Sequence, residues 1–318
     1  MESSVVIPTF NRAALLEQTL SALASQVGRP EPKSAAGDPH SAGRYEVIVV
    51  DDGSKDPTPD LVRRMSKDYP VPLHYLRQNN RKQGAARNLG ARKAAGGLLI
   101  FLGDDTVPAP EFLQWHRSSH TGQPAHRVVI GYTPWARTCP RTRFMEYIGE
   151  RGWQFGFSLI EDPENVPFNF FYTSNLSMRR DFFWEASGFD EDFHEYGWED
   201  IELSLRLYKM GMQLAYNSQA IAYHHHPTSL LSFAQRQKKV GRSAWTFYRK
   251  HPDMGEFLSL DSPPRYTRWK GTKLTLLTWL CGVTEKWGWP DLSGYYPDLM
   301  SYHYYLGLRK GRHEQLGS

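Results

Sequence analysis

Short hydrophobic runs alternate with amphipathic segments over the first hundred residues. The runs are nearly continuous in Val, Ile, Leu or Phe, as in parallel strands covered on both faces, and they lie at 4–7, 47–50, 73–76 and 98–102. Between them, apolar residues recur at spacings of three and four, the period of an amphipathic helix. We expect Asn11 to cap the first helix and Gly84 to open the third. Strand–helix–strand units of this length predict a doubly wound α/β sheet.

The remaining chain is less regular. Residues 28–44 are rich in Pro, Gly, Ala and Ser and lack a hydrophobic period, which predicts a flexible surface loop. Another helix is predicted to begin near Trp198 and to end at Gly211. We expect an α/β domain over residues 1–230 and a helical extension over residues 231–318.

Composition and charge exclude several classes of protein. Lys and Arg number 38 and Asp and Glu 34, so the net charge of +4 argues against a dedicated nucleic-acid binder, and we expect no nucleic-acid partner. Two cysteines are too few for a disulfide scaffold. The chain has neither a signal-peptide pattern at its start nor an apolar run of about 18–20 residues, so we expect a cytoplasmic protein. Aromatic residues make up 14%, which fits either a well-filled core or a binding cleft with stacking surfaces.

Polar side chains follow the predicted strands, where open α/β sheets bind their ligands. Asp104 and Asp105 end the fourth strand, and buried carboxylates there are costly unless they are paired, solvated or bound to a cation. Such oxygens suit Mg²⁺ or Mn²⁺ held together with substrate phosphates. Arg12 and Arg87 could meet the charge of a diphosphate. The alternative is that the sequences DDG at 51–53 and GDD at 103–105 form ordinary turns.

The phosphate-binding glycine loops of dinucleotide oxidoreductases and P-loop NTPases are absent from the sequence. The segments VVIPTFNR, EVIVVDDGSKD, GAARNLGAR, FLGDDTVP and GWEDIELSLRL instead closely resemble family 2 of the GT-A glycosyltransferases, inverting enzymes that use nucleotide sugars. The resemblance covers roughly residues 4–230, with the motifs in the family's order. It implies a GT-A fold, a Rossmann-like, mostly parallel doubly wound sheet, with a nucleotide-sugar donor (a UDP-sugar above others) and Mn²⁺ or Mg²⁺.

Matched position by position, the resemblance also implies which residues hold the donor. These are Pro8, Thr9, Arg12, Asp52, Gly84, Arg87 and Asp104. The first position of the family's D-x-D signature is Gly103 here. The resemblance therefore implies that Asp104 takes the ribose side and that Asp105 binds the metal.

Glu199 and Asp200 begin the predicted helix near Trp198. The resemblance implies that Asp200 is the general base, which removes the proton of the acceptor hydroxyl during direct displacement. It implies that Glu199 either holds the acceptor or supports the residues that do. The alternative is structural, because acidic residues in a first turn interact favourably with the helix macrodipole.

Three histidines, at 224–226, follow an apolar, strand-like stretch. Alternate residues of an extended segment point to one side, so His224 and His226 could face the site together. In related enzymes a histidine of this region binds the metal, and imidazole suits Mn²⁺ better than Mg²⁺. We predict His224 as the ligand, with His226 as the alternative. Solvated loop histidines before Pro227 are the other reading.

The acceptor is less defined by the sequence. Trp198 could stack on a sugar or pack in the core, and Asn175 could bind sugar hydroxyls or cap a turn. We expect the aromatic segments 153–157 and 168–172 to shape this side. Saccharides, lipid-linked glycans and other hydroxyl compounds remain open as acceptors. The basic, aromatic stretch 235–250 could contact a membrane surface weakly or pack on the α/β domain.

Two other functions fit a similar fold. A noncatalytic module could bind a sugar nucleotide or a glycan, but loss of Asp200 or of the Asp104–Asp105 pair would then be expected, and both are present. A sugar nucleotidyltransferase would carry a Gly-rich, basic first loop, whereas the loop here reads PTFNR. Glycosyl transfer is the interpretation that the sequence favours.

Overall fold

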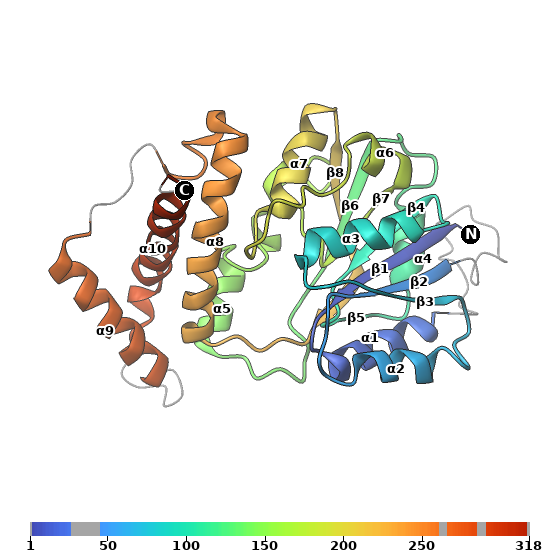
Figure 1. The fold of residues 1–318 in the computed structure, drawn as a ribbon, viewed down its shortest axis with the longest axis horizontal. Helices are drawn as coiled ribbons and strands as arrows, with labels where there is room; N and C mark the ends of the chain where they lie inside the picture. The colour runs from blue at the N-terminus through green and yellow to red at the C-terminus, as the bar shows by residue number, and fades with distance from the viewer. Residues whose placement is uncertain (1, 27–44, 261–265, 285–290, 317–318) are drawn as a thin grey trace. The chain divides into compact units, whose positions relative to one another are not determined.

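The computed structural model describes residues 2–26, 45–260, 266–284 and 291–316, which form two compact units (Figure 1). The sheet unit comprises 1–139, 155–191 and 200–226, and the helical unit comprises 140–154, 192–199 and 227–318. The loop predicted at 28–44 lies outside the described residues.

The sheet unit is built on one eight-stranded sheet. The strands are β1 (Ser3–Thr9), β2 (Tyr45–Asp51), β3 (Leu73–Arg77), β4 (Leu98–Leu102), β5 (Thr106–Pro108), β6 (Arg127–Tyr132), β7 (Asn175–Arg179) and β8 (Gln213–His224). Their order is β3-β2-β1-β4-β7-β6-β8-β5. Strands β1 to β4 are parallel, as predicted, while β7 runs antiparallel to β4 and β6, and β5 antiparallel to β8. The predicted doubly wound α/β sheet is confirmed, with two reversed strands.

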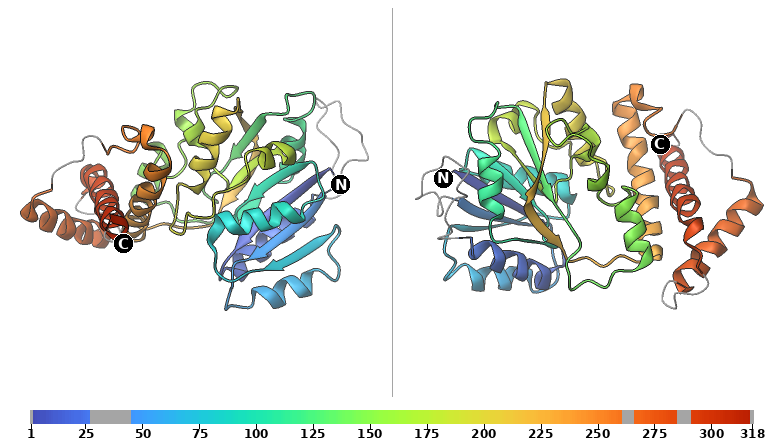
Figure 2. Two further views of the ribbon diagram at one scale, coloured as in Figure 1. Left: turned by 45° about the horizontal axis from the view of Figure 1, so that its top comes forward. Right: turned by 180° about the vertical axis from the view of Figure 1, so that it is seen from behind.

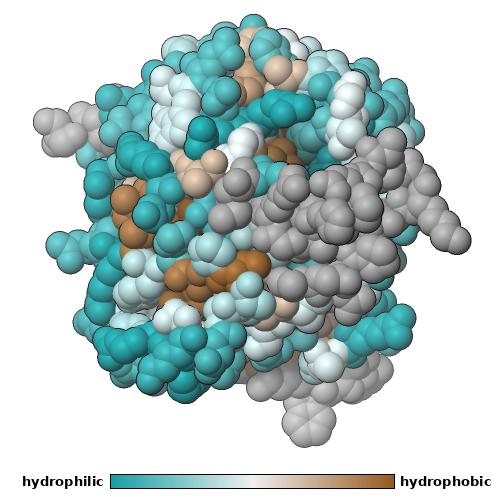
Figure 3. All heavy atoms as spheres, turned by 90° about the vertical axis from the view of Figure 1, so that its right-hand side faces the viewer, coloured by the Kyte–Doolittle hydropathy of each residue, from teal (hydrophilic) through white to brown (hydrophobic). Residues whose placement is uncertain are grey.

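Helices cover both faces of this sheet (Figures 1 and 2). One face packs against α1 (Ala13–Ala24), α2 (Thr58–Met65) and α4 (Phe112–Ser118). The other packs against α3 (Lys82–Lys93), α6 (Arg180–Glu185) and α7 (Glu199–Lys209). Burial on both faces explains why the strands read as continuous hydrophobic runs. On the side where β1 begins, the described surface is mostly hydrophilic, and apolar side chains gather only in patches (Figure 3).

The start of α1 differs from the prediction. Asn11 does not cap the helix: it has a φ of 54°, and its Oδ1 accepts a hydrogen bond from the Lys55 N–H at 2.7 Å. Asp56 caps it instead, because its Oδ2 accepts from the Ala13 N–H at 2.8 Å. The short Asn side chain tolerates the left-handed conformation, which places it in the β2–α2 loop rather than over the helix end. Helix α3 begins two residues before Gly84, at Lys82.

The helical unit contains three helices in the C-terminal part of the chain, where helices were predicted: α8 (Leu230–Lys250), α9 (Arg268–Thr284) and α10 (Tyr296–Leu316). It also contains α5 (Arg143–Glu150), which was not predicted, and short 3-10 turns at Pro252–Met254 and Ser293–Tyr295. Helices α8 and α10 approach closely through glycines: a Cβ on Gly241 would collide with the backbone of Tyr304, and one on Gly307 with that of Lys238. Among the described residues, no helix is long and apolar enough to cross a membrane.

Candidate active site

The carboxyl ends of the parallel strands bring the predicted acidic residues to one edge of the sheet. Thr9 is the last residue of β1, and Asp104 follows β4, its immediate neighbour. The Thr9 hydroxyl donates to Asp104 Oδ2 at 2.8 Å, and Pro8 precedes Thr9 on the same strand. The carboxyl groups of Asp104 and of its neighbour Asp105, together called the acidic pair, are mostly shielded from solvent, so they require partners.

Arg12 supplies one of those partners. Its Nη1 lies 3.0 Å from Asp104 Oδ1 and 2.6 Å from Asp105 Oδ2. Burial and the neighbouring charge of Asp105 raise the pKa of Asp104 despite this contact. The pKa of Asp105 moves the opposite way: burial raises it, but the hydrogen bond and charge of His224, together with Arg12, outweigh burial and lower it. The two carboxyl groups therefore differ in acidity, and Asp105 is the more strongly anionic of the two.

His224 closes the other side of the acidic pair. Strand pairing sets Thr106 of β5 opposite His224 of β8, and the His225 N–H donates to the carbonyl of Asp105 at 2.8 Å. His224 Nε2 then lies 3.5 Å from Asp105 Oδ2. The ring of His226 is 5.9 Å from that of His224, so both predicted histidines lie at this edge of the sheet. The pairing of β8 with β5 thus brings the histidines at the end of β8 to the carboxyl end of β4, which Asp104 and Asp105 follow.

Asp52 holds the start of α3. Its Oδ1 accepts from Gln78 Nε2 and from the Arg81 N–H, both at 2.7 Å, and its Oδ2 accepts from the Lys82 N–H at 2.9 Å. These bonds satisfy backbone donors that the first turn of a helix leaves unpaired. This capping role was not predicted from the sequence, because the donors lie about thirty residues further along the chain.

Gly84 and Arg87, also predicted to face the donor, lie buried on α3. The guanidinium of Arg87 donates to Gln83 Oε1 at 3.1 Å and stacks over the ring of Phe189 at 5.4 Å. The next residue, Asn88, donates to the Phe189 carbonyl at 2.8 Å. These contacts fix α3 against the segment that follows α6.

Asp200 lies beside an aromatic cluster. Its Oδ1 accepts from the Ile201 N–H at 2.9 Å, and its charge adds to burial in raising the pKa of Tyr172 to about 12. The ring of Phe155 is 5.3 Å from that of Tyr172 and 5.6 Å from that of His224. We call this cluster the aromatic platform; its members, all partly exposed, are Tyr132, Phe155, Phe157, Tyr172 and Tyr216. It extends from His224 to the neighbourhood of Asp200.

Two predicted acceptor residues lie elsewhere. Asn175 is buried in the sheet, where its Oδ1 pairs with His116 Nε2 at 2.8 Å and its Nδ2 donates to the Ala220 carbonyl at 2.9 Å. Because its amide is satisfied inside the fold, it does not face an acceptor. Trp198 shows the packing alternative: its Nε1 donates to the Val240 carbonyl at 3.0 Å within the helical unit.

Glu199, the residue before Asp200, is buried at the first position of α7.

Sequence comparison decides the family. Residues 4–186 match the model of Glycosyl transferase family 2, and residues 98–289 match that of Glycosyl transferase family group 2. The chain belongs to glycosyltransferase family 2. The glycosyltransferase fold and family expected from the motifs are thereby confirmed.

Curated relatives support this membership. Validoxylamine A glucosyltransferase of Streptomyces hygroscopicus subsp. limoneus is 32% identical over 277 residues, 79% of this chain and 57% of the relative. Chondroitin synthase of Escherichia coli is 28% identical over 260 residues, 70% of this chain and 34% of the relative. The family 2 chain described here thus spans about three fifths of the first relative and one third of the second.

Solved structures show the same fold. The mannosyltransferase PcManGT from Pyrobaculum calidifontis superposes with a TM-score of 0.61 at 17% identity, covering 99% of this chain and 88% of that one. TarS of S. aureus superposes with a TM-score of 0.54 at 16% identity, covering 100% of this chain and 92% of that one. At these identities the likeness concerns the fold alone.

Proposed function

We propose that this family 2 chain is an inverting, metal-dependent glycosyltransferase that moves a sugar from a nucleotide-diphosphate sugar, foremost a UDP-sugar, to an acceptor hydroxyl. The observation that carries the proposal is the group of charged and polar side chains after β4, where two largely buried carboxylates meet a guanidinium and an imidazole. Arg12 Nη1 lies 3.0 Å from Asp104 Oδ1 and 2.6 Å from Asp105 Oδ2, and His224 Nε2 lies 3.5 Å from Asp105 Oδ2. Such a set matches a diphosphate and a divalent cation in charge and in ligand type.

The donor atoms fit a metal that is shared with the substrate. Within the described ranges, no group of three or more His, Cys, Asp or Glu could hold a metal by itself. Asp105 Oδ2 and His224 Nε2 are 3.5 Å apart, close to the roughly 3 Å between neighbouring ligands of an octahedral ion with bonds of about 2.1 Å. Diphosphate and water would complete the shell, and His226 is the alternative ligand. When bound, the metal would neutralise the charge that develops on the leaving diphosphate.

The ligands of the solved structures support the proposal. PcManGT was solved with GDP-Man and Mn²⁺, and TarS with UDP and with UDP-GlcNAc. We extend nucleotide-sugar binding to this chain, with Pro8, Thr9 and Asp104 toward the nucleoside and Arg12 toward the phosphates. Asp52 contributes by holding the loop that leads into α3, where Gly84 and Arg87 lie.

Asp200 is proposed as the general base. In a single displacement, the acceptor oxygen forms a bond to the anomeric carbon, the bond from that carbon to the diphosphate breaks, and the hydroxyl proton passes to Asp200. The aromatic platform offers ring faces on which the apolar face of a sugar can stack. We therefore propose a polyhydroxylated ring as acceptor. This agrees with the similarity to validoxylamine A glucosyltransferase and chondroitin synthase.

A donor panel tests the proposal. UDP-, GDP- and dTDP-sugars are incubated with the chain, with and without Mn²⁺, and release of nucleotide diphosphate is followed. We expect UDP release that requires Mn²⁺ and increases when a saccharide acceptor is added. Donor binding without any release would indicate a binding module, and pyrophosphate exchange would indicate a nucleotidyltransferase; either result would refute glycosyl transfer.

A further inference from the structure

Helix α9 is apolar on two opposite sides. One side packs within the helical unit through Leu274, Thr278 and Cys281, which recur at spacings of four and three and are buried. Thr278 Oγ1 lies 2.9 Å from His303 Nε2 of α10, and a Cβ on Gly282 would press on the side chain of Leu231 of α8. This side of the helix therefore has its partners.

The opposite side carries exposed aromatic and aliphatic side chains. Trp269, Leu276 and Trp279 are 76%, 56% and 57% exposed, and Val283 is also exposed. Their spacings of seven, three and four put them in one row along the helix, which we call the α9 stripe. A helix that is apolar all round is normally buried all round. Among the described residues, the stripe is the side of α9 that lacks such a cover.

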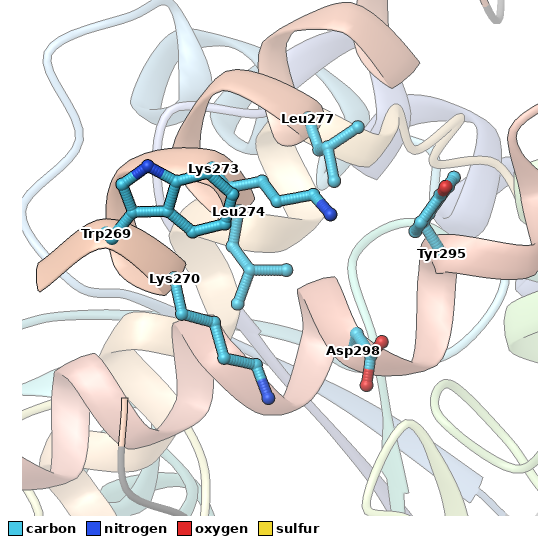
Figure 4. A pocket seen from close by; sticks show the side chains of 7 residues that line it. All are labelled: Trp269, Lys270, Lys273, Leu274, Leu277, Tyr295 and Asp298. Carbon is cyan, nitrogen blue, oxygen red and sulfur yellow. The ribbon is translucent and has the colours of Figure 1, made fainter. Parts of the chain in front are cut away.

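Cations accompany the stripe. A cavity of about 330 Å³ opens beside it, and Figure 4 shows the ammonium ends of Lys270 and Lys273 directed toward the side where Tyr295 and Asp298 lie. Lys273 Nζ is 5.9 Å from the centre of the Trp269 ring. Helix α9 contains no Asp or Glu, and Asp298 of α10 is the one acidic residue that lines the cavity, so the two lysines leave this surface with an excess of positive charge.

We propose that the α9 stripe docks on the surface of an anionic lipid bilayer. Trp, Leu and Val side chains would enter the boundary between headgroups and acyl chains, and the two lysines would lie among lipid phosphates. Trp is the residue that favours this boundary, because its ring is apolar and its N–H is polar.

A second copy of the chain is the weaker occupant. In a two-fold contact the same surface lies on both sides, so the lysines of one α9 would face those of the other. Asp298 of α10 is the carboxylate that lines the cavity with the two lysines, so each copy would bring two cations and one anion, an excess of positive charge, to such an interface. Anionic lipid supplies the missing charge. The inference does not depend on which donor or acceptor the sheet unit uses.

Vesicle co-sedimentation of the full chain tests the proposal. We compare vesicles of phosphatidylcholine alone with vesicles that contain phosphatidylglycerol, at low and high salt. We expect binding to the anionic vesicles that weakens with salt, with the partition coefficient reduced about fivefold for each of Lys270→Gln and Lys273→Gln. The double substitution Leu276→Ser/Trp279→Ser should reduce it on the order of tenfold or more, and since both side chains are exposed, the fold should persist, as circular dichroism will show.

A matched control separates this stripe from exposed apolar residues in general. Leu159→Ser removes a leucine of similar exposure, 52%, from the sheet unit, and should leave vesicle binding unchanged. Three results would overturn the proposal: no binding to anionic vesicles, equal binding by the stripe variants, or a concentration-dependent dimer that the stripe variants abolish. The last of these would assign the stripe to a second copy of the chain.

Discussion

Arg12 Nη1 lies 2.6 Å from Asp105 Oδ2, although the two residues are 93 positions apart in the chain. The same nitrogen is 3.0 Å from Asp104 Oδ1, so one guanidinium compensates two neighbouring carboxylates. The permanent charge of Arg12 balances one of the two carboxylates, and His224, 3.5 Å from Asp105, adds a positive charge only when it is protonated. A divalent cation would neutralise the excess negative charge that remains beside a neutral imidazole. The arrangement links the stability of this edge of the sheet to cation binding.

The first prediction concerns Arg12→Met. Removal of the guanidinium leaves two largely buried carboxylates without it, and the free energy of unfolding at pH 7 should fall by about 1–3 kcal/mol, less than for a fully buried pair because the Arg12 side chain is 37% exposed. Mn²⁺ should restore part of the loss. Urea unfolding with and without Mn²⁺ measures both effects. Arg63→Met, which removes an exposed ion pair with Asp60, is the control and should change stability by no more than about 0.5 kcal/mol.

The second prediction concerns the division of roles within the acidic pair. Asp105→Asn should reduce UDP affinity in Mn²⁺ to the value measured in EDTA, because the more strongly anionic carboxylate is lost while its shape is kept. Asp104→Asn should weaken UDP binding but preserve its dependence on Mn²⁺. Titration calorimetry gives both affinities. An Asp105→Asn protein whose binding still responds to Mn²⁺ would show that the metal is held elsewhere.

The sequence predicted the first half of the fold better than the second. Strands β1 to β4 are continuous apolar runs because helices cover both faces, so their pattern is visible without any tertiary information. Strand β7, with the sequence NLSMR, has no such run. Its Asn175 and Ser177 are buried and hydrogen-bonded to His116 of α4, and no local sequence pattern indicates a polar strand in a sheet interior.

For the candidate site, too, the sequence could group the residues that follow the first four strands, but not those that the later part of the chain brings in. Asp104, Asp105 and Arg12 follow strands that are adjacent in a parallel sheet, so topology alone brings them together. Tyr172 was predicted only as part of an aromatic segment, because its proximity to Asp200 depends on how residues after β6 fold. The misplacement of Asn175 has the same origin: its partners lie on α4 and β8, distant in sequence.

The third prediction uses two buried histidines, His116 of α4 and His120, which follows the end of that helix. His116 Nδ1 and His120 Nε2 each lie 2.8 Å from Ser177 Oγ. Burial lowers the pKa of His116 to about 4, and burial together with the neighbouring charges of His116, Arg179 and Arg127 lowers the pKa of His120 to about 3. Both rings are therefore neutral in the folded protein at pH 7 and accept protons more readily when it unfolds.

The resulting stability is fully present above a pH of about 6.5 and is lost as the pH falls toward the lowered values, with a slope of up to about 1.4 kcal/mol per pH unit for each histidine. Urea unfolding at pH 7, 6 and 5 measures this slope. The substitution His116→Gln should make the slope shallower, even though it lowers stability at pH 7. A slope identical to that of the parent chain would show that other groups control the acid sensitivity.

The last prediction separates catalysis from helix stability at Asp200. If the carboxylate only interacts with the macrodipole of α7, Asp200→Asn should cost a few tenths to about 1 kcal/mol of stability and leave turnover intact. If it is the general base, the same substitution keeps the shape and lowers turnover about 10²- to 10⁴-fold, with UDP-sugar affinity little changed. Asp181→Asn is the matched control, because Asp181 is an acidic residue in the first turn of α6, away from the aromatic platform. We expect Asp181→Asn to retain turnover and Asp200→Asn to lose it, measured as sugar transfer under saturating donor. If the two variants transfer sugar at equal rates, the proton must be removed by another group.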